Sequence, residues 1–231
     1  MSKKPLGRRA YGSIPHLPCS RMGPGDWSIP EGQQRICTEK VRDSHDVIVV
    51  QEKLDGSCVA VALIDDAIHP LIRAGWPADS SPYEQHHLFA QWVRQNEDRF
   101  RVILKNGERL CGEWLAQAHG TVYDLNGREP FAVFDLMIGD RRISYDALHE
   151  RIDGHFSTPS LLHVGDAIGV EKALEIHSRH KWPCDEIEGV VYRCERRGQV
   201  EFLAKYVRPD KKDGKYLPEM SGAEAVWNWH P

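Results

Sequence analysis

The chain has 231 residues, 41% of them hydrophobic, and a net charge of −4, which allows one sizeable core and argues against a generally basic nucleic-acid coat. No apolar run is long enough to span a bilayer, and no apolar segment follows the N-terminal lysines, so neither a membrane span nor a secretory signal is expected. The six cysteines contain no C-x-x-C pair and no zinc-like spacing, which favours reduced thiols in a cytoplasmic protein.

The first 46 residues are rich in Pro, Gly and Ser, so loops and short elements are expected there. Gly23-Pro24-Gly25 has the form G-x-G, but no strand precedes it and no helix follows, which excludes a dinucleotide fingerprint. Beyond this segment, a turn at Asp65-Asp66 separates the second and third of three predicted strands. These strands lie near 47–52, 58–64 and 68–74.

A helix is predicted over 80–98, because Ser81 can cap it, Pro82 suits a first turn, and apolar residues recur along one face. His86 and His87 lie on this helix. Adjacent helical positions point about 100° apart, so we expect two surface histidines and no shared metal.

The second half of the chain mixes strands and helices. Asn106-Gly107 is a strong hairpin signal between the first two of these strands. Because the order shows no regular βαβ alternation, the pattern favours an α+β fold built on antiparallel sheets. The predicted strands lie near 101–104, 109–115, 131–138, 189–194 and 200–207, and the predicted helices near 145–153 and 167–180.

Charge is unevenly distributed along the chain. Residues 1–21 hold five basic side chains and no acid, and residues 193–216 hold eight basic side chains and four acids. The other 186 residues therefore sum to −13. Two basic segments on an acidic body suit a polyanion bound on one face, although two solvated lysine-rich loops would give the same pattern.

The stretch Glu52-Lys53-Leu54-Asp55-Gly56 carries charged residues directly after an apolar strand. It brings one lysine into a tight turn between two predicted strands, where the side chain can point at whatever lies over the sheet. Asp-Gly is also a common hairpin signal, so a surface turn is the alternative interpretation of this stretch alone.

Four further stretches embed a charged or aromatic residue in a predicted strand or at its end. A charge in an apolar strand is costly unless it is paired, hydrogen-bonded or facing a cleft. Several such residues around one sheet therefore indicate a shared polar pocket. The stretches are Arg73-Ala74-Gly75, Gly112-Glu113-Trp114, Phe131-Ala132-Val133-Phe134-Asp135, and Glu188-Gly189-Val190-Val191 with Lys205 on the next strand.

In this order, K-x-D-G, R-x-G, G-E-W, F-D-L, E-G-V-V and a closing lysine resemble the motifs of the covalent nucleotidyltransferase superfamily, which includes RNA ligases, DNA ligases and mRNA capping enzymes. The likeness is closest to ATP-dependent RNA ligases, whose nucleophile motif often begins with a glutamate, as at Glu52. It implies an ATP-grasp-like core of antiparallel sheets flanked by helices. Only 23 residues follow Arg208, too few for an OB domain.

The expected organisation has three parts: a basic, loop-rich extension over 1–46, a nucleotidyltransferase domain over 47–208, and a short basic tail over 209–231. The N-terminal stretches 14–18 and 21–26 also resemble what precedes the core in small bacterial and phage RNA ligases. Such a minimal core could rely on a partner protein to supply a clamp.

The resemblance implies that Lys53 attacks the α-phosphate of ATP and becomes lysyl-AMP, with Mg²⁺ or Mn²⁺ as the metal. The AMP then passes to a 5′-phosphate end of RNA, either at a strand end or at a nick in a duplex. A 3′-hydroxyl finally displaces it. Each step is an in-line phosphoryl displacement, in which positioning and charge neutralisation dominate.

The same resemblance gives roles to individual residues. Lys53, Asp55, Glu188 and Lys205 are the expected catalytic residues, with Glu188 positioning the metal and Lys205 pairing with the α-phosphate. The expected nucleotide-binding residues are Glu52 at the adenine amino group, Gly56 in the turn, Arg73 at ribose or phosphate, Glu113 at ribose, Phe134 on the base, and Lys205. From the residues alone, Phe134 could equally be core, Glu188 a turn residue and Lys205 an ordinary strand-end lysine.

A nucleophilic lysine must lose its proton, and its reference pKa of about 10.4 must fall by roughly three units to do so near neutral pH. Partial burial and positive charge from the metal and Lys205 are the expected sources.

Two features depart from the family pattern. Leu203 stands where many members have a second lysine, so Arg208 or Lys211 is a candidate substitute. The tail lysines Lys211, Lys212 and Lys215, together with the N-terminal basic segment, are the candidates for gripping substrate. A DNA nick ligase and a non-catalytic nucleotide- or nucleic-acid-binding module of the same fold remain the alternative functions.

Overall fold

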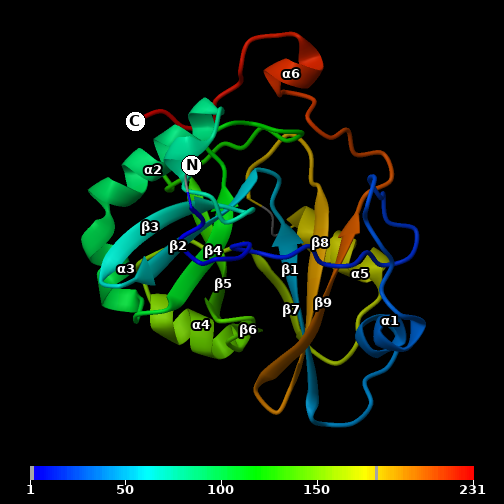
Figure 1. The fold of residues 1–231 in the computed structure, drawn as a ribbon. Helices are drawn as coiled ribbons and strands as arrows, with labels where there is room; N and C mark the ends of the chain where they lie inside the picture. The colour runs from blue at the N-terminus through cyan, green and yellow to red at the C-terminus, as the bar shows by residue number, and fades with distance from the viewer. Residues whose placement is uncertain (1–2, 180–181) are drawn as a thin grey trace.

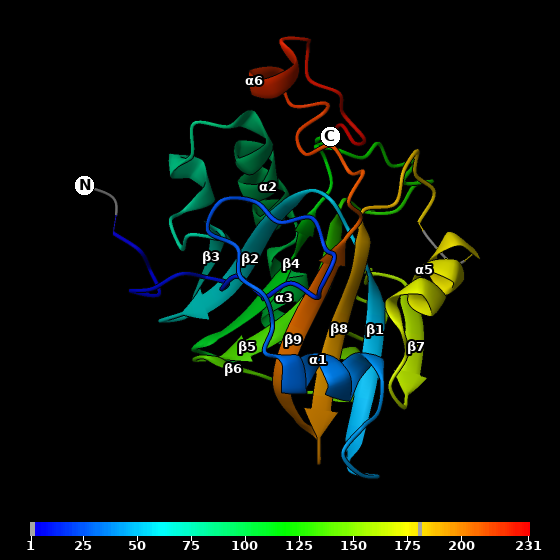
Figure 2. The same ribbon diagram turned by 90° about the vertical axis from the view of Figure 1, so that its right-hand side faces the viewer.

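The computed structural model describes residues 3–179 and 182–231. Its strands form two antiparallel sheets, with the orders β7-β1-β8-β9 (sheet A) and β3-β2-β4-β5-β6 (sheet B). Figures 1 and 2 show the two sheets facing one another, with helices on their outer sides. This confirms the predicted α+β fold of antiparallel sheets flanked by helices.

The strands and helices have the following bounds. The strands are β1 (Asp46–Lys53), β2 (Ser57–Ile64), β3 (Ala67–Ile72), β4 (Glu108–Trp114), β5 (Phe131–Ile138), β6 (Arg141–Arg142), β7 (Leu161–Gly165), β8 (Gly189–Arg196) and β9 (Gln199–Val207). The helices are α1 (Glu31–Thr38), α2 (Glu84–Gln95), α3 (Glu97–Ile103), α4 (Tyr145–Ile152), α5 (Val170–Arg179), α6 (Pro218–Ser221) and a 3₁₀ turn at Ala78–Ser80.

Each sheet buries its outer face under helices, because alternate residues of a strand point to opposite sides. On sheet B, β2, β4 and β5 contribute apolar side chains to a core shared with α2, α3 and α4. On sheet A, β1, β8 and β9 do the same with α1 and α5. The inner faces are therefore free to carry polar residues towards the space between the sheets.

Both ends of the chain pack on this body. The N-terminal segment crosses the inner face of sheet B, where Ala10 and Tyr11 belong to a small apolar cluster with β2 and β4. It then runs beside β9 through isolated parallel bridges that join His16 to Lys205 and to Ser28. The C-terminal segment returns to the loop after β4, where the Asn228 side chain donates to Leu115 O at 2.8 Å.

The predicted strand over 101–104 is wrong, since Arg101 to Ile103 end α3. Phe100 and Ile103 are both buried, which is the three-residue spacing of a helix face. Gly107, at a φ of 86°, consequently turns the chain from α3 into β4 and does not join two strands.

The helix predicted over 80–98 is broken at both ends. Ser81 is extended, with φ −75° and ψ 147°, because a residue before proline is disfavoured in the helical region. Helix α2 therefore begins at Glu84, and Asn96 separates it from α3. The prediction missed β7. The predicted helix 167–180 corresponds to α5, which begins three residues later, at Val170, and position 180 lies outside the described residues.

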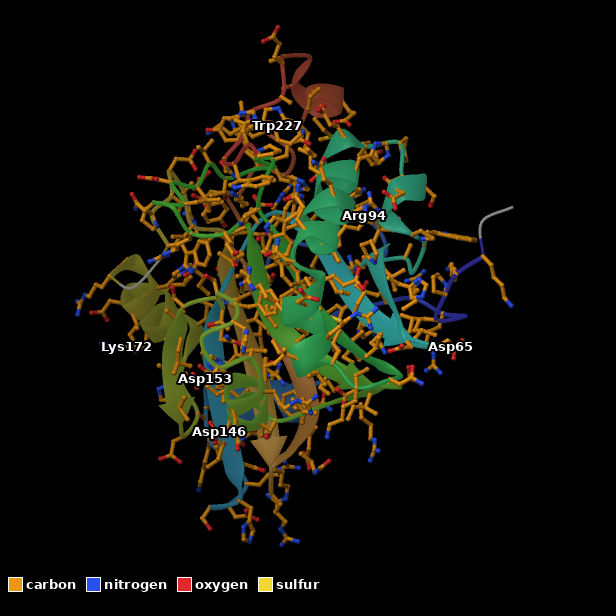
Figure 3. The ribbon with its side chains drawn as sticks, turned by 90° about the vertical axis from the view of Figure 1, so that its left-hand side faces the viewer. Asp65, Arg94, Asp146, Asp153, Lys172 and Trp227 are labelled. Atoms are coloured by element: carbon orange, nitrogen blue, oxygen red, sulfur yellow. The ribbon has the colours of Figure 1, made fainter. Side chains whose placement is uncertain are left out.

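The turn between β2 and β3 follows the prediction. Asp65 and Asp66 have φ values of 48° and 62°, the left-handed values that a two-residue hairpin turn requires. Figure 3 shows Asp65 at this tip of sheet B. Within the described residues, no helix is long and apolar enough to cross a membrane.

Candidate active site

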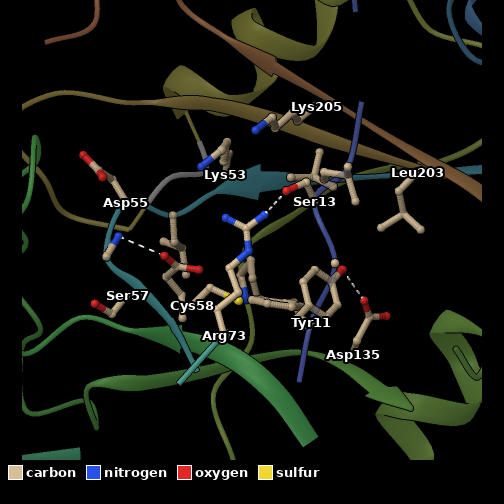
Figure 4. A pocket seen from close by; sticks show the side chains of 18 of the residues that line it. Tyr11, Ser13, Lys53, Asp55, Ser57, Cys58, Arg73, Asp135, Leu203 and Lys205 are labelled. Carbon is tan, nitrogen blue, oxygen red and sulfur yellow. Dashed lines mark hydrogen bonds between the residues drawn. The ribbon is translucent and has the colours of Figure 1, made fainter. Parts of the chain in front are cut away.

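A cavity of about 740 Å³ lies between the inner faces of the two sheets. Sheet A lines it with Lys53, Lys205 and Leu203, and sheet B lines it with Glu113 and Phe134. The N-terminal segment forms a third wall through residues 11–14. Figure 4 shows Lys53, Lys205 and Arg73 directed into this common space. Segments distant in sequence therefore build one polar pocket, as the motif pattern predicts.

Lys53 is the last residue of β1 and lies opposite Gly189 at the start of β8. Its Nζ donates to Glu188 Oε2 at 2.7 Å, and its side chain is 22% exposed. A Cβ at position 189 would lie 1.9 Å from the carbonyl oxygen of Tyr206 on β9. Only glycine therefore lets β8 and β9 pack closely beside the lysine, which explains the Glu-Gly sequence.

The turn after Lys53 is held by the cavity's other wall. Gly56 N–H donates to Glu113 Oε1 at 3.1 Å, and a Cβ at position 56 would lie 2.4 Å from Trp114 O. Asp55 N–H donates to the Tyr123 hydroxyl at 2.9 Å. The glycine is thus required for close approach of the turn to β4.

Three carboxylates surround the Lys53 ammonium. Burial lowers the pKa of Lys53, but Glu188, Glu113 and Asp55 outweigh it, so this pKa lies above its ordinary value. Burial raises the pKa of Glu188 to about 7 and that of Glu113 to about 8, although Lys53 opposes both shifts. The described protein groups therefore favour a charged lysine. Without a bound metal, the expected fall in the pKa of Lys53 is wrong.

Asp55 faces two donors that are distant in sequence, Gly120 and Lys211. Its Oδ2 accepts from Gly120 N–H at 2.9 Å and lies 3.1 Å from Lys211 Nζ. Lys211 also donates to Gly120 O at 2.7 Å and is only 2% exposed. Lys211 is therefore a buried support of the turn after Lys53, which corrects its prediction as a substrate-gripping tail lysine.

Arg73 and Phe134 lie where the sequence predicts, but both contact the N-terminal segment. Arg73 Nη2 donates to Ser13 Oγ at 2.5 Å. The ring of Phe134 packs edge-on against Tyr11 at 5.1 Å between centroids. Both residues line the cavity, so the N-terminal segment takes part in its shape.

Glu52 also lines the cavity, but its carboxylate turns away from Lys53. Its Oε2 accepts from Trp182 N–H at 3.1 Å, and its Oε1 lies 3.9 Å from His177 Nε2 on α5. Because Glu52 and Lys53 are successive residues of β1, their side chains point to opposite faces.

Lys205 is the cavity lysine of β9. Its Nζ lies 3.7 Å from Asp26 Oδ1, and its side chain is 16% exposed. Burial and the neighbouring Lys53 and Arg73 lower the pKa of Lys205, while Asp26 and Glu188 oppose this shift. Leu203, two positions earlier, faces the same cavity. Arg208 pairs with Glu186 and Asp210 instead, so neither Arg208 nor Lys211 replaces the second lysine at the cavity wall.

Sequence reasoning missed a polar cluster beside the turn. His86 lines the cavity, with Nε2 3.3 Å from Ser57 Oγ and Nδ1 2.6 Å from Ser81 Oγ. Burial lowers its pKa to about 4. The prediction of a surface histidine is therefore wrong for His86, though His87 is exposed. The one sequence signal for this cluster is Ser57, a polar residue directly after the K-x-D-G motif.

Asp135 was quoted within the F-D-L motif but given no role. It accepts from the Tyr11 hydroxyl at 2.6 Å and from Arg142 Nε at 3.0 Å, and it pairs with Arg193 of β8. Because Arg193 lies on sheet A and Asp135 on sheet B, this buried ion pair joins the two sheets at the wall of the cavity.

Within residues 3–179 and 182–231, no group of three or more His, Cys, Asp or Glu side chains is arranged to hold a metal ion. The buried carboxylates of Glu188 and Glu113 are nevertheless hard oxygen donors beside a nucleotide-sized cavity. This donor set fits Mg²⁺ or Mn²⁺, since Mg²⁺ commonly binds through one or two carboxylates, substrate phosphates and waters.

Fold and site together define an α+β core of two antiparallel sheets around a polar cavity, and the family comparison is more specific. A family model described as RNA ligase matches residues 46–207. The chain belongs to the RNA ligase family. A search of curated proteins found no match.

Among the solved structures, an archaeal ligase supports the fold, and two further ligase structures are reported for comparison only. An archaeal ATP-dependent RNA ligase has 17% identity and a TM-score of 0.53, with 85% of this chain and 48% of that chain covered. A Naegleria gruberi RNA ligase variant with ATP and Mn has 17% identity and a TM-score of 0.47, with 71% and 50% covered. Another variant of that ligase, with AMP and Mn, has 17% identity and a TM-score of 0.48, with 87% of this chain and 60% of that chain covered. The chain thus spans about half the length of these structures.

Proposed function

We propose that this chain is an ATP-dependent RNA ligase that works through a lysyl-AMP intermediate on Lys53. The observation that carries the proposal is the position of Lys53 Nζ, inside the inter-sheet cavity and 2.7 Å from the buried Glu188. A surface hairpin turn, the alternative interpretation of this stretch, would leave the ammonium in solvent.

In the first step, Lys53 Nζ attacks the α-phosphorus of ATP, the new N–P bond forms as the bond to pyrophosphate breaks, and the amine proton must leave. Glu188 accepts the hydrogen bond of the ammonium and so orients Nζ within the cavity. Lys205 and Arg73 supply positive charge to phosphate oxygens.

A bound Mg²⁺ or Mn²⁺, held through Glu188, would neutralise phosphate charge. Pairing of Glu188 with the cation would weaken its hold on the lysine proton. Phe134 would stack on the adenine, Glu113 and Gly56 would border the ribose, and Asp55 would fix the turn. The same pocket would then present AMP to a 5′-phosphate of RNA, and a 3′-hydroxyl would displace it.

For Glu52, the hydrogen bond to Trp182 N–H favours a supporting role at the adenine end, through the backbone that it fixes. A direct contact of its carboxylate with the adenine amino group would require that side chain to change its direction. We also propose that residues 47–208 form the catalytic unit, on which 1–46 and 209–231 pack.

The decisive test is incubation with ATP labelled in its α-phosphate, followed by denaturing electrophoresis. Wild type should retain the label covalently, and Lys53→Ala should abolish it. Lys172→Ala is a matched control, because that lysine is 60% exposed on α5, lies at the outside of the molecule (Figure 3) and does not line the cavity. Labelling that survives in Lys53→Ala would refute the assignment of the nucleophile.

A chase then distinguishes the candidate functions. Addition of 5′-phosphorylated RNA should remove the label from the protein and yield adenylylated or sealed RNA. A faster transfer to DNA, with sealing of DNA nicks, would identify a DNA ligase instead. ATP binding without any adduct would identify a binding module of the same fold.

A further inference from the structure

The backbone of Lys205 is held on both sides by the N-terminal segment. Lys205 N–H donates to Pro15 O at 2.9 Å, and Leu17 N–H donates to Lys205 O at 2.8 Å. Pro15 and Leu17 lie outside residues 46–207, the part of the chain that the family model matches. At this lysine, a segment beyond the matched core therefore pairs with the edge of β9 that β8 leaves open.

The same segment also meets the side chain of Lys205. Asp26 Oδ1 lies 3.7 Å from Lys205 Nζ, while Asp26 Oδ2 accepts from Gly23 N–H at 2.9 Å. A tight turn places this carboxylate, since Asp26 N–H donates to Gly23 O at 3.2 Å and Gly25 has a φ of 82°. The turn leaves one carboxylate oxygen facing the cavity lysine.

His16 holds the other oxygen of Asp26. Its Nε2 lies 3.0 Å from Asp26 Oδ2, and the residue is only 1% exposed. Its Nδ1 lies 2.7 Å from Ser20 Oγ, which itself accepts from Val207 N–H at 2.9 Å. When the Ser20 hydroxyl donates to Nδ1, the imidazole proton lies on Nε2, the ring nitrogen that faces Asp26.

Two cations and two carboxylates surround the Lys205 ammonium. Lys53, on β1, and Arg73, after β3, both face the Lys205 ammonium and repel it, and Glu188 and Asp26 are the carboxylates that attract it. Glu188 is already bonded to Lys53 at 2.7 Å. Asp26 is therefore the carboxylate that holds Lys205 beside two other cations.

We propose that Asp26, fixed by His16, is a positioning residue that keeps the Lys205 ammonium at the point where the α-phosphate is attacked. Asp26 acts through Lys205 and does not itself touch the nucleotide. The inference rests on the proposed function, because it deepens the role of Lys205 in AMP transfer.

The first test compares the rate of lysyl-AMP formation at saturating ATP. Asp26→Asn keeps the shape but removes the charge, and should lower this rate about 10- to 100-fold, the range expected when a reacting group is misplaced by about 1 Å. The KM for ATP should change less than about threefold, because the lost contact acts mainly in the transition state. Asp26→Glu should restore part of the rate.

A double-mutant cycle separates positioning from general support of the segment. In a Lys205→Ala background, Asp26→Asn should cause no further loss, since both changes remove one interaction. Asp140→Asn is the matched control, because it breaks the exposed ion pair of Asp140 with Arg8 and should leave the rate unchanged. Additive losses, or a rise in KM with a lower melting temperature, would overturn the proposal.

A second measurement does not require activity. Removal of the Asp26 charge should leave Lys205 more often neutral, so acetic anhydride at pH 8 should acetylate Lys205 several-fold faster in Asp26→Asn than in wild type. Mass spectrometry of the peptides gives this rate. Unchanged acetylation would overturn the positioning role, whereas faster acetylation in a chain that forms no lysyl-AMP would refute only the proposed function.

Discussion

Strand β1 carries a buried charge at each end, and the two charges are satisfied differently. At its start, Asp46 accepts from Arg42 Nη2 at 2.7 Å and from Arg196 Nη1 at 2.8 Å. At its end, Lys53 is one cation among the carboxylates of Glu188, Glu113 and Asp55. At the first end two arginines pair with one buried anion, and at the second three carboxylates surround one cation.

The pKa values record this difference. Hydrogen bonds from Arg42 and Arg196 hold the pKa of Asp46 well below its ordinary value against the effect of burial. Burial raises the pKa of Glu188 to about 7 and that of Glu113 to about 8. The charge of Asp46 at the start of β1 is thus compensated by its arginine partners. At the end of β1, an additional cation would stabilise the ionised forms of Glu188 and Glu113.

The largest effect should follow from Glu188→Gln. Loss of this carboxylate should lower the rate of lysyl-AMP formation about 10²- to 10³-fold, since one preorganised electrostatic partner of the reacting groups is removed. The free energy of unfolding should stay the same or rise, because a buried charge with an unfavourable pKa disappears. Labelling rates and urea unfolding measure the two effects.

Glu186→Gln is the control for this experiment, since Glu186 is two residues away and pairs with Arg208 at 3.3 Å. It should retain the wild-type labelling rate. A Glu188→Gln protein that labels as fast as this control would contradict the comparison.

Asp46→Asn should show the opposite combination, with a smaller effect. The free energy of unfolding should fall by about 2 kcal/mol, because the buried carboxylate has two arginine partners that are themselves partly exposed. The labelling rate of the folded protein should not change. Asp43→Asn, at a 47% exposed partner of Arg196, should cost less than about 1 kcal/mol. Urea unfolding at pH 7 measures both losses of stability. Equal losses in Asp46→Asn and Asp43→Asn would contradict the prediction, because only Asp46 is buried.

The smallest effect concerns the pH dependence of stability, which should have opposite signs at the two ends. The folded pKa of Asp46 is depressed, so its contribution is present above the unfolded value of about 3.9 and is lost as pH falls below it. The folded pKa of Glu188 is raised to about 7, so its contribution is lost as pH rises from about 4.3, the unfolded value, to about 7.

Urea unfolding from pH 3 to pH 8 tests these signs. Asp46→Asn should reduce the loss of stability below pH ~4, and Glu188→Gln should reduce the loss between pH ~4.3 and ~7. Parallel pH profiles for wild type and both variants would show that neither group titrates as described.

The sequence predicted which residues line the cavity better than it predicted the contacts that shape the cavity. The ends of apolar strands brought Lys53, Glu113, Phe134 and Lys205 to one cavity, because alternation fixes which residues face inward. The same alternation could have shown that Glu52 and Lys53 point apart. That signal was present but was not used.

Other errors could be avoided only with knowledge of partners that are distant in the sequence. His86 and Lys211 were interpreted from their own helix or tail, where a polar residue is normally exposed. In the structure, Ser57 lies beside His86, and Asp55 lies beside Lys211. Local pattern cannot reveal contacts between residues this far apart in the chain, and the same reason hid the pairing of Asp26 with Lys205.

The bonds between the N-terminal segment and β9 have a consequence for synthesis of the protein. Residues 15 and 17 leave the ribosome long before Lys205, yet they flank that lysine in the finished sheet. The cavity between the sheets therefore closes only after β9 has emerged and the earliest part of the chain has returned to it. A nascent chain can expose Lys53 without a complete pocket, so formation of the covalent adduct would report that folding has finished.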